Sequence, residues 1–302
     1  MRKAIITILL VAAATITFAQ EEHKKDTCYW THKGDIGLNI SQSAFSNWVA
    51  GGQNALAWQG LFNYELHYAK DNFKWDNTLN TGLGYSYFDL TRKPIKTEDK
   101  LEFTSLAGLK ANEHLDYSLE LAFRSQFAPG YDYAVDSTLA ISRFLAPAYI
   151  TLGVGIQWVP NKHFSINFAP LTGRIVIVND TAIARILDFE PIIDPNDPNI
   201  HYYNDKVRVE FGARAVVKFN YPLAQNIDFD TKLELFSNYL ENPQFIDVDW
   251  QNAIIMKINS WLNCSINTHM IYDYDIHFPD KKDGSKVQFK EVLSLGILFK
   301  LR

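Results

Sequence analysis

The feature that most constrains this chain is an alternation of apolar and polar residues that recurs along most of its length. Between residues 56 and 68 the sequence LAWQGLFNYELHY places large apolar side chains on one face of a strand and polar ones, such as Glu65 and His67, on the other. Residues 73–87 repeat the pattern. Alternation of this kind is typical of β-strands that have an apolar environment on one face and water on the other.

About twelve such segments follow one another, each near the ten-residue length of a strand that crosses a bilayer at a tilt. An even number of strands suits a bacterial barrel with both chain ends on one side. The last segment runs to the end of the sequence, and pairing it with residues 34–38 would leave no free edge. We expect strands to start near Asp35, Ala55, Phe73, Lys100, Leu115, Ala148, Phe164, Lys206, Ile227, Phe245, Leu262 and Val287.

The connections between these segments alternate between short and long. Tight, turn-rich connections lie at residues 70–72, 112–114, 160–162, 222–226 and 259–260, and longer ones at 89–99, 128–147, 179–205, 239–244 and 275–286. Short turns on one side and long loops on the other are typical of outer-membrane barrels. The sequence therefore predicts an all-β fold, a closed antiparallel up-and-down transmembrane β-barrel of about twelve strands, over residues 34–302.

The N-terminus has the layout of an export signal. Arg2 and Lys3 precede an apolar stretch from Ala4 to about Phe18, and Ala19 stands before a polar residue. We expect residues 1–19 to be a cleaved signal peptide, residues 20–33 to be an N-terminal periplasmic segment, and the protein to reach the bacterial outer membrane. No later run is long and apolar enough to predict a transmembrane helix.

The polar face carries charges from many segments, and in a membrane barrel this face lines the lumen. Lys110, Lys218 and Asp230 lie on it, and both signs are mixed, which favours ladders of ion pairs over a ring of one sign. The candidate lumen-lining residues are Glu65, His67, Lys74, Asp76, Glu102, Glu120, Arg124, Arg208, Glu210, Arg214, Lys232, Glu234, Asp249, Lys257 and His269.

A soluble secreted β-sandwich or barrel would show the same alternation with its apolar face inside, and the pattern alone does not say which face is concave. The export signal, the strand lengths and the turn asymmetry favour the membrane. So do aromatic residues near strand ends, where interfacial girdles would lie: Trp58, Trp75, Trp158, Tyr221 and Trp261.

Two places interrupt the pattern. Pro170 lies inside an expected strand, and because proline cannot donate a ladder hydrogen bond we expect a bulge or a strand end there. The longest connection, residues 179–205, contains the amphipathic piece TAIARILDFEPII, which would either enter the lumen as a plug or constriction or form a surface lid. The acidic stretch 194–199 within it lacks the spacing of a calcium loop and fits proline-broken Asx-turns.

The composition narrows the function classes. A formal net charge of -5, with 47% hydrophobic and 21% charged residues, excludes a disordered chain and a basic nucleic-acid binder. Cys28 and Cys264 are the only cysteines, and sequence does not decide whether they pair. We expect no metal site, no cofactor and no nucleic-acid partner.

Residues 45–58 read FSNWVAGGQNALAW, and their glycine pair could suggest a phosphate-binding loop. No strand-to-helix pattern or phosphate-loop lysine accompanies Gly51 and Gly52, so we interpret them as a turn that uses glycine's freedom at positive φ. Phe45 and Trp48 are then candidates for local packing or for contact with a partner.

A lipid hydrolase is a second class to weigh, because Ser265, Asn267, His269 and Asp273 lie close in sequence. Barrel phospholipases have a motif around their catalytic His and Ser that this chain lacks. Polar lumen residues that bond one another explain the same set, so we expect no enzyme activity.

The segment from Ser43 to Tyr87, SAFSNWVAGGQNALAWQGLFNYELHYAKDNFKWDNTLNTGLGYSY, followed later by FAPLTGRIVIV, resembles the uncharacterised outer-membrane proteins grouped as domain of unknown function 3078. Asn47-Trp48, Gly51-Gly52, Trp75-Asp76-Asn77 and Pro170-Leu171-Thr172 are the most specific parts. The resemblance implies an outer-membrane β-barrel without an established biochemical role, and it supplies no catalytic residues.

We therefore expect an outer-membrane barrel in contact with lipid that is either a narrow pore for small polar solutes or an envelope structural or assembly component. The charged lumen motivates the pore. An envelope protein partner would bind loop aromatics, for which the candidates are Phe45, Trp48, Tyr131, Tyr133, Tyr202 and Tyr203.

Overall fold

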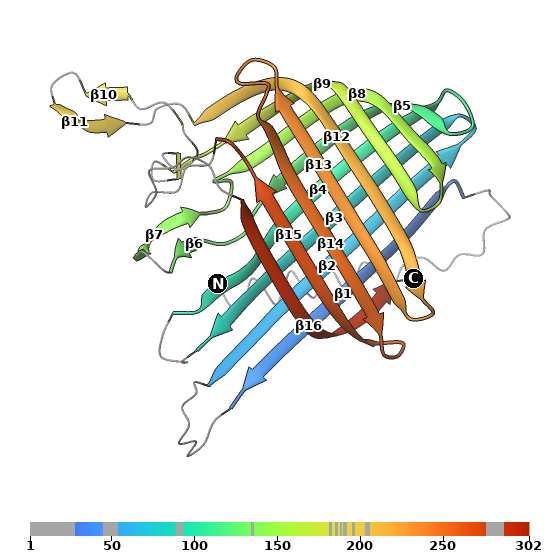
Figure 1. Ribbon diagram of the computed structural model, residues 1–302, viewed down its shortest axis with the longest axis horizontal. Helices are drawn as coiled ribbons and strands as arrows, with labels where there is room; N and C mark the ends of the chain where they lie inside the picture. Colours follow the sequence, from blue (N-terminus) through green and yellow to red (C-terminus); the bar gives the residue numbers. More distant parts are fainter. Residues whose placement is uncertain are drawn as a thin grey trace.

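The computed structural model describes residues 28–44, 54–88, 93–133, 136–180, 183–184, 187, 189, 192–194, 197–202, 206–275 and 287–301. Within these ranges twelve antiparallel strands close into one barrel, and each strand pairs with the strands before and after it in the barrel (Figure 1). They are β1 (Trp30–Ser43), β2 (Ala55–Lys70), β3 (Phe73–Tyr87), β4 (Ile95–Lys110), β5 (Leu115–Ser125), β8 (Ala148–Asn161), β9 (Phe164–Ile177), β12 (Val207–Ala224), β13 (Ile227–Asn238), β14 (Ile246–Lys257), β15 (Leu262–Tyr272) and β16 (Gln288–Leu301).

The barrel closes where β1 meets β16, in a register that runs from Gly34 opposite Leu301 to Asn39 opposite Gly296. Closure pairs the edge strands that would otherwise expose backbone donors and acceptors. The predicted closed barrel of twelve antiparallel strands is confirmed. Most strands begin within one residue of the expected position, but β1 begins at Trp30 and β4 at Ile95, about five residues early.

The early start of β1 has a packing reason. Trp30 is the register partner of Tyr68 in β2, and its ring centroid lies 4.9 Å from that of Tyr68 and 5.8 Å from that of Trp75 in β3. His32 stacks on Tyr64 at 6.0 Å on the same outer face. The polar His32 interrupts the alternation of apolar and polar residues. For that reason the sequence did not predict residues 30–33 as strand and assigned them to the expected periplasmic segment 20–33.

The two ends of the barrel differ as expected. Short turns join β2 to β3, β4 to β5, β8 to β9, β12 to β13 and β14 to β15, and Asp71 in the first of these has the positive φ of a tight hairpin turn. At the other end, two of the long connections contain small hairpins, β6 (Gly130–Asp132) with β7 (Asp136–Ser142) and β10 (Ile192–Asp194) with β11 (Asp197–Tyr202). Figure 1 shows both hairpins at this long-loop end.

The outer surface of the barrel is apolar. Large hydrophobic side chains are exposed on neighbouring strands around the wall, for example Leu38, Leu119, Val154, Leu171, Val209, Leu293 and Phe299. Charged side chains such as Glu120, Arg214 and Asp249 are buried instead. A soluble barrel or sandwich would have the opposite arrangement, so this structure does not support the soluble alternative.

Aromatic side chains lie near both ends of the strands. Trp75, Trp158, Tyr221 and Trp261 are exposed toward the short-turn end, where Trp158 meets Phe164 edge to face with ring centroids 6.0 Å apart. Trp58 lies toward the long-loop end, with its ring centroid 5.8 Å from that of Tyr85. This is the arrangement of interfacial aromatic girdles.

The expected irregularity at Pro170 is confirmed as a bulge. Opposite β12, Ala169 pairs with Arg214 while Thr172 pairs with Gly212, so Pro170 and Leu171 together face one residue. The register with β8 shifts at the same place. A side chain at Gly155 of β8 would put its Cβ 1.9 Å from the Phe168 carbonyl oxygen, which explains the glycine there.

The bulge changes which residues of β9 face inward. Before it, the odd-numbered Ser165 and Asn167 line the lumen, and after it the even-numbered Arg174 bonds the inward-facing Glu210. A one-residue shift moves every later side chain to the other face of a strand. The bulge therefore places Arg174 inside the barrel.

Candidate functional site: the barrel lumen

The lumen contains a cavity of about 630 Å³ that the inner faces of most barrel strands line. Seven of the expected lumen residues border it directly: Glu65, His67, Asp76, Glu120, Arg214, Lys232 and His269. The other expected lumen residues form ion pairs at the long-loop end, at the short-turn end and in the middle of the barrel.

At the long-loop end, three strands and one residue beyond a fourth meet in a buried ion-pair network. Glu210 of β12 accepts from Arg174 of β9 and, at 2.8 Å, from Arg208. Arg174 also reaches Asp247 of β14 at 2.8 Å, and Arg208 reaches Asp275 beyond β15 at 2.8 Å. Only 1% of the Glu210 side chain is exposed, so these charges depend on one another for solvation.

Part of the 179–205 connection closes over this network. We call its described residues Ile183, Ala184, Leu187 and Phe189 the mouth segment, and all four are buried against Val176, Val178 and Ala146. The mouth segment is a helical turn in which the Leu187 amide donates to the Ile183 carbonyl at 3.2 Å. No helix in the described ranges is long and apolar enough to span a bilayer.

Arg208 fixes the mouth segment to the barrel wall. Its Nη1 donates to the Leu187 carbonyl at 2.9 Å, and its guanidinium lies 5.3 Å from the centroid of the Phe189 ring. Val176 lies on the same inward face of β9 as Arg174, so the mouth segment packs against the inner face of the wall at the long-loop end. Burial raises the pKa of the Asp275 carboxyl at this site, although nearby Arg208 opposes the shift.

In the middle of the barrel, Arg214 joins two strands. It donates to Glu120 of β5 at 2.5 Å and to Glu234 of β13 at 2.8 Å. Asn167 donates to the other oxygen of Glu120 and accepts from Ser118 at 2.7 Å. Every member of this network is therefore satisfied by side chains from β5, β9, β12 and β13, strands that do not all pair with one another.

A second middle network crosses the lumen. Asp249 of β14 accepts from Arg124 of β5 at 2.7 Å, from Gln251 at 3.0 Å, and is 2.9 Å from the His269 ring nitrogen. On β4, Lys100 pairs with Glu102 at 3.2 Å. Arg124 and Asp249 are 125 residues apart in sequence, so the barrel curvature brings them together.

The ion-pair groups at the short-turn end contain fewer residues, and their lysine side chains are more exposed to solvent. His67 lies between Glu65 at 3.0 Å and Asp76 at 2.8 Å, and Lys33 also pairs with Glu65 at 2.9 Å. Lys74 pairs with Asp116 at 2.9 Å, and Lys257 pairs with Asp228. The side chain of Lys33 is 69% exposed, and such solvated pairs contribute little to stability.

The residues considered for hydrolysis do not form a catalytic pair. Ser265 bonds Ser294 at 2.9 Å, whereas His269 bonds Asp249. The two lie four residues apart on β15, a separation of about 13 Å along a strand. No group of three or more His, Cys, Asp or Glu in the described part of the chain is placed to hold a metal ion.

Arg174 and Asp247 are lumen residues that the alternation did not identify. Both take part in the long-loop network, and the signal that could have found Arg174 was Pro170, because a bulge there reverses the later alternation. Both cysteines are free. The candidate loop residues Phe45, Trp48, Gly51 and Gly52 lie outside the described residues. Among the loop aromatics, Tyr131 and Tyr133 meet edge to face with ring centroids 6.0 Å apart.

A closed antiparallel barrel with an apolar exterior and a charged, water-accessible lumen defines the structural class of this chain. Residues 40–131 match the family model described as protein of unknown function (DUF3078). This match confirms the resemblance noted in the sequence. It contains Asn47-Trp48, Gly51-Gly52 and Trp75-Asp76-Asn77, while Pro170-Leu171-Thr172 lies beyond it.

Among solved structures, the chain is similar to an outer membrane channel from Pseudomonas putida F1, with 12% identity and a TM-score of 0.39 over 92% of this chain and 100% of that one. It is also similar to the NanC porin, with 9% identity and a TM-score of 0.35 over 88% and 97%. The translocator domain of the autotransporter NalP from Neisseria meningitidis gives 9% identity and a TM-score of 0.33 over 99% and 96%. No curated protein matches the chain.

Proposed function

We propose that this barrel spans the bacterial outer membrane and forms a narrow pore for small polar solutes. The observation that carries the proposal is the distribution of side chains, which is the reverse of that in a soluble barrel. Large hydrophobic side chains are exposed outside, and a charged cavity of about 630 Å³ lies inside. A bilayer stabilises such an exterior, and water and polar solutes suit such an interior.

The membrane part of the proposal is tested by heat-modifiable migration on a detergent gel. A closed membrane barrel resists unfolding until it is boiled, so the unboiled protein is expected to migrate differently from the boiled protein. Protein that stays soluble without detergent and shows no such shift would contradict the membrane location.

The pore part is tested by single-channel conductance in a planar bilayer. We expect small conductance steps from the complete protein, because we propose that the 179–205 connection, through its mouth segment, narrows the long-loop end. Replacing residues 179–205 by a short Gly-Ser linker should enlarge the steps. Absence of steps from both proteins rules out the pore, while equal steps from both would mean that this connection does not constrict it.

A role as an envelope structural or assembly component is the second candidate. The two hairpins β6–β7 and β10–β11 favour it, because they stand outside the barrel wall at the long-loop end where a partner could bind (Figure 1). Deleting residues 192–202 should then abolish crosslinking to an envelope protein and leave the gel shift intact. Crosslinking that recovers only the monomer would remove this candidate.

We also infer that the protein is not a lipid hydrolase. The separation of Ser265 from His269, and the bond of His269 to Asp249 instead, support this inference. Lipase activity in the purified barrel that disappears in both Ser265→Ala and His269→Ala would overturn it.

A further inference from the structure

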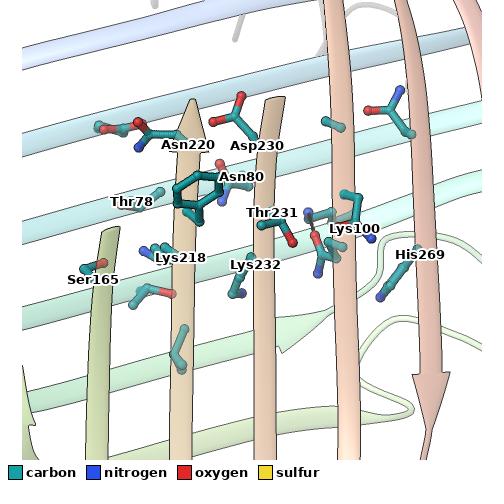
Figure 2. Close-up of a pocket in the computed structure, with 18 of the residues that line it drawn as sticks. Thr78, Asn80, Lys100, Ser165, Lys218, Asn220, Asp230, Thr231, Lys232 and His269 are labelled. Carbon is teal, nitrogen blue, oxygen red and sulfur yellow. Dashed lines mark hydrogen bonds between the residues drawn. The ribbon is translucent and has the colours of Figure 1, made fainter. Parts of the chain in front are cut away.

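Two lysines lie side by side on the inner wall of the barrel, at paired positions of neighbouring strands. Lys218 of β12 and Lys232 of β13 are direct register partners, and both line the central cavity. Figure 2 shows the two side chains on neighbouring strands, with Asn220 and Asp230 one step further along. Like charges directly opposite each other destabilise an antiparallel pair, so this arrangement needs an explanation.

The other basic side chains that border the cavity are neutralised. Lys33, Lys100, Arg214 and Lys290 each have a carboxylate oxygen within 3.2 Å, as close as 2.5 Å for Arg214 and 2.7 Å for Lys290. Lys218 makes no ion pair with any residue in the described ranges. The nearest carboxylate oxygen to Lys232 belongs to Glu234 at 3.7 Å, and the other oxygen of Glu234 is occupied by Arg214 at 2.8 Å.

The acids near the two lysines are occupied elsewhere or lie out of reach. Glu120 is bonded by Arg214 and Asn167, and Glu65 by Lys33 and His67. Glu102, whose charge acts on Lys232, is paired with Lys100 at 3.2 Å. Asp230 is two residues from Lys232 along β13, but it forms no salt bridge with either lysine, and its charged neighbours are Asp228, Lys257 and Lys33. The lysine pair is therefore a local excess of positive charge.

Neutral hydrogen-bonding groups line the same cavity as this pair. Thr78 and Asn80 on β3, Ser165 on β9 and Asn220 on β12 also line the cavity (Figure 2). Hydroxyl and amide side chains of this kind bond hydroxyl-bearing solutes, and the cavity volume lies within the range of small-ligand sites. The site thus combines two cationic donors with neutral donors and acceptors.

We propose that Lys218 and Lys232 form an anion-binding subsite for the carboxylate or phosphate group of a small polar solute in the lumen. This inference deepens the proposed pore function and gives its solute a charge. A bound anion accepts a charge-assisted hydrogen bond from each ammonium group and removes the repulsion between them. The pair then costs stability in the empty barrel and provides affinity in the occupied one.

The test is equilibrium binding to the complete, detergent-folded barrel, measured by titration calorimetry at fixed ionic strength. Inorganic phosphate and acetate are the two probes, and the tighter one identifies the anionic group that the subsite prefers. Lys218→Gln and Lys232→Gln should each weaken binding at least about tenfold, as loss of a charge-assisted hydrogen bond predicts. The gel shift verifies that each variant is folded.

Two other lysines serve as comparisons. Lys70→Gln, at the end of β2 and outside the cavity, should bind the probe as the wild type does. Lys33→Gln removes a cavity charge that already has a partner, so its loss should be clearly smaller than that of Lys218→Gln. The proposal is overturned if the wild type binds neither probe, or if Lys33→Gln weakens binding as much as Lys218→Gln.

The reversal potential in a planar bilayer separates this subsite from the pore itself. Under a KCl gradient the wild type should favour anions, and Lys218→Gln with Lys232→Gln should reduce that preference. Phosphate or acetate binding without conductance would support the subsite and contradict the pore. Conductance without binding of either probe would support the pore and contradict the subsite.

Discussion

The long-loop end of the lumen and its central cavity both contain basic and acidic side chains, but they differ in how completely the basic side chains are paired with carboxylates. At the long-loop end, Arg174 and Arg208 each contact two carboxylate side chains, and the mouth segment covers them. In the central cavity, Lys218 borders the open space of the lumen and forms no ion pair with the part of the chain that the structure describes. Burial makes pairing obligatory where apolar residues exclude water, whereas a water-filled cavity solvates a lone ammonium group.

The largest expected effect comes from breaking a pair in the covered region. Glu210→Ala leaves Arg174 and Arg208 buried without their shared partner, and loss of one member of a buried network costs about 3–5 kcal/mol. The measurement is the free energy of unfolding by urea in detergent micelles. Glu65→Ala is the matched control at the central cavity, because the side chains of Glu65 and its partner Lys33 are 34% and 69% exposed and the expected loss is at most about 1 kcal/mol. Equal losses in the two variants would erase the distinction between the regions.

The next effect tests the bulge that directs Arg174 into the covered region. Gly155→Ala would place a Cβ against the Phe168 backbone, and overpacking of this kind costs about 1–3 kcal/mol. Gly60→Ala is the control, since the nearest atom to its added Cβ is 3.9 Å away. Urea unfolding of the two variants compares them, and an unchanged Gly155→Ala protein would mean that β8 and β9 can shift apart without loss.

A smaller effect concerns pH at the covered end. Since burial raises the pKa of Asp275, the folded state holds that proton more tightly than the unfolded chain, so this group lowers stability as the pH rises above about 4. Asp275→Asn should remove this loss of unfolding free energy with rising pH. The loss is at most about 1 kcal/mol, because the carboxyl is partly exposed. Unfolding measured from pH 3 to pH 7 (roughly the range over which a carboxyl with a raised pKa titrates) checks this, and identical slopes in the two proteins would contradict it.

The smallest effect has the opposite sign and belongs to the open region. Lys218→Gln should stabilise the anion-free barrel by about half a kcal/mol, because it removes a like charge opposite Lys232. Thermal unfolding in a buffer without phosphate or carboxylates measures the gain. A loss of stability would show that Lys218 already has a stabilising partner.

Much of the fold could be predicted because strand alternation is a local property. Residues 56–68 alternate except at Leu61, which lies on the polar face, and they form β2. Pro170 predicted a bulge or a strand end in β9 from its missing donor, and the structure has the bulge. The start of β1 could not be placed, because the polar His32 occupies an outward position, where its ring stacks on Tyr64 of the neighbouring strand. The inward position of Arg174 likewise depended on how β9 shifts against both of its neighbours.

The sequence by itself determined the twelve strands, the short and long ends and the division of each strand into an apolar and a charged face, since these follow from spacing along the chain. Only the tertiary structure decided which face is concave and which charges pair. Lys290 and Glu98 are 192 residues apart and meet at 2.7 Å because the barrel closes. Lys218 stands opposite another lysine, and not opposite an acid, because β12 and β13 meet in the register that pairs it with Lys232.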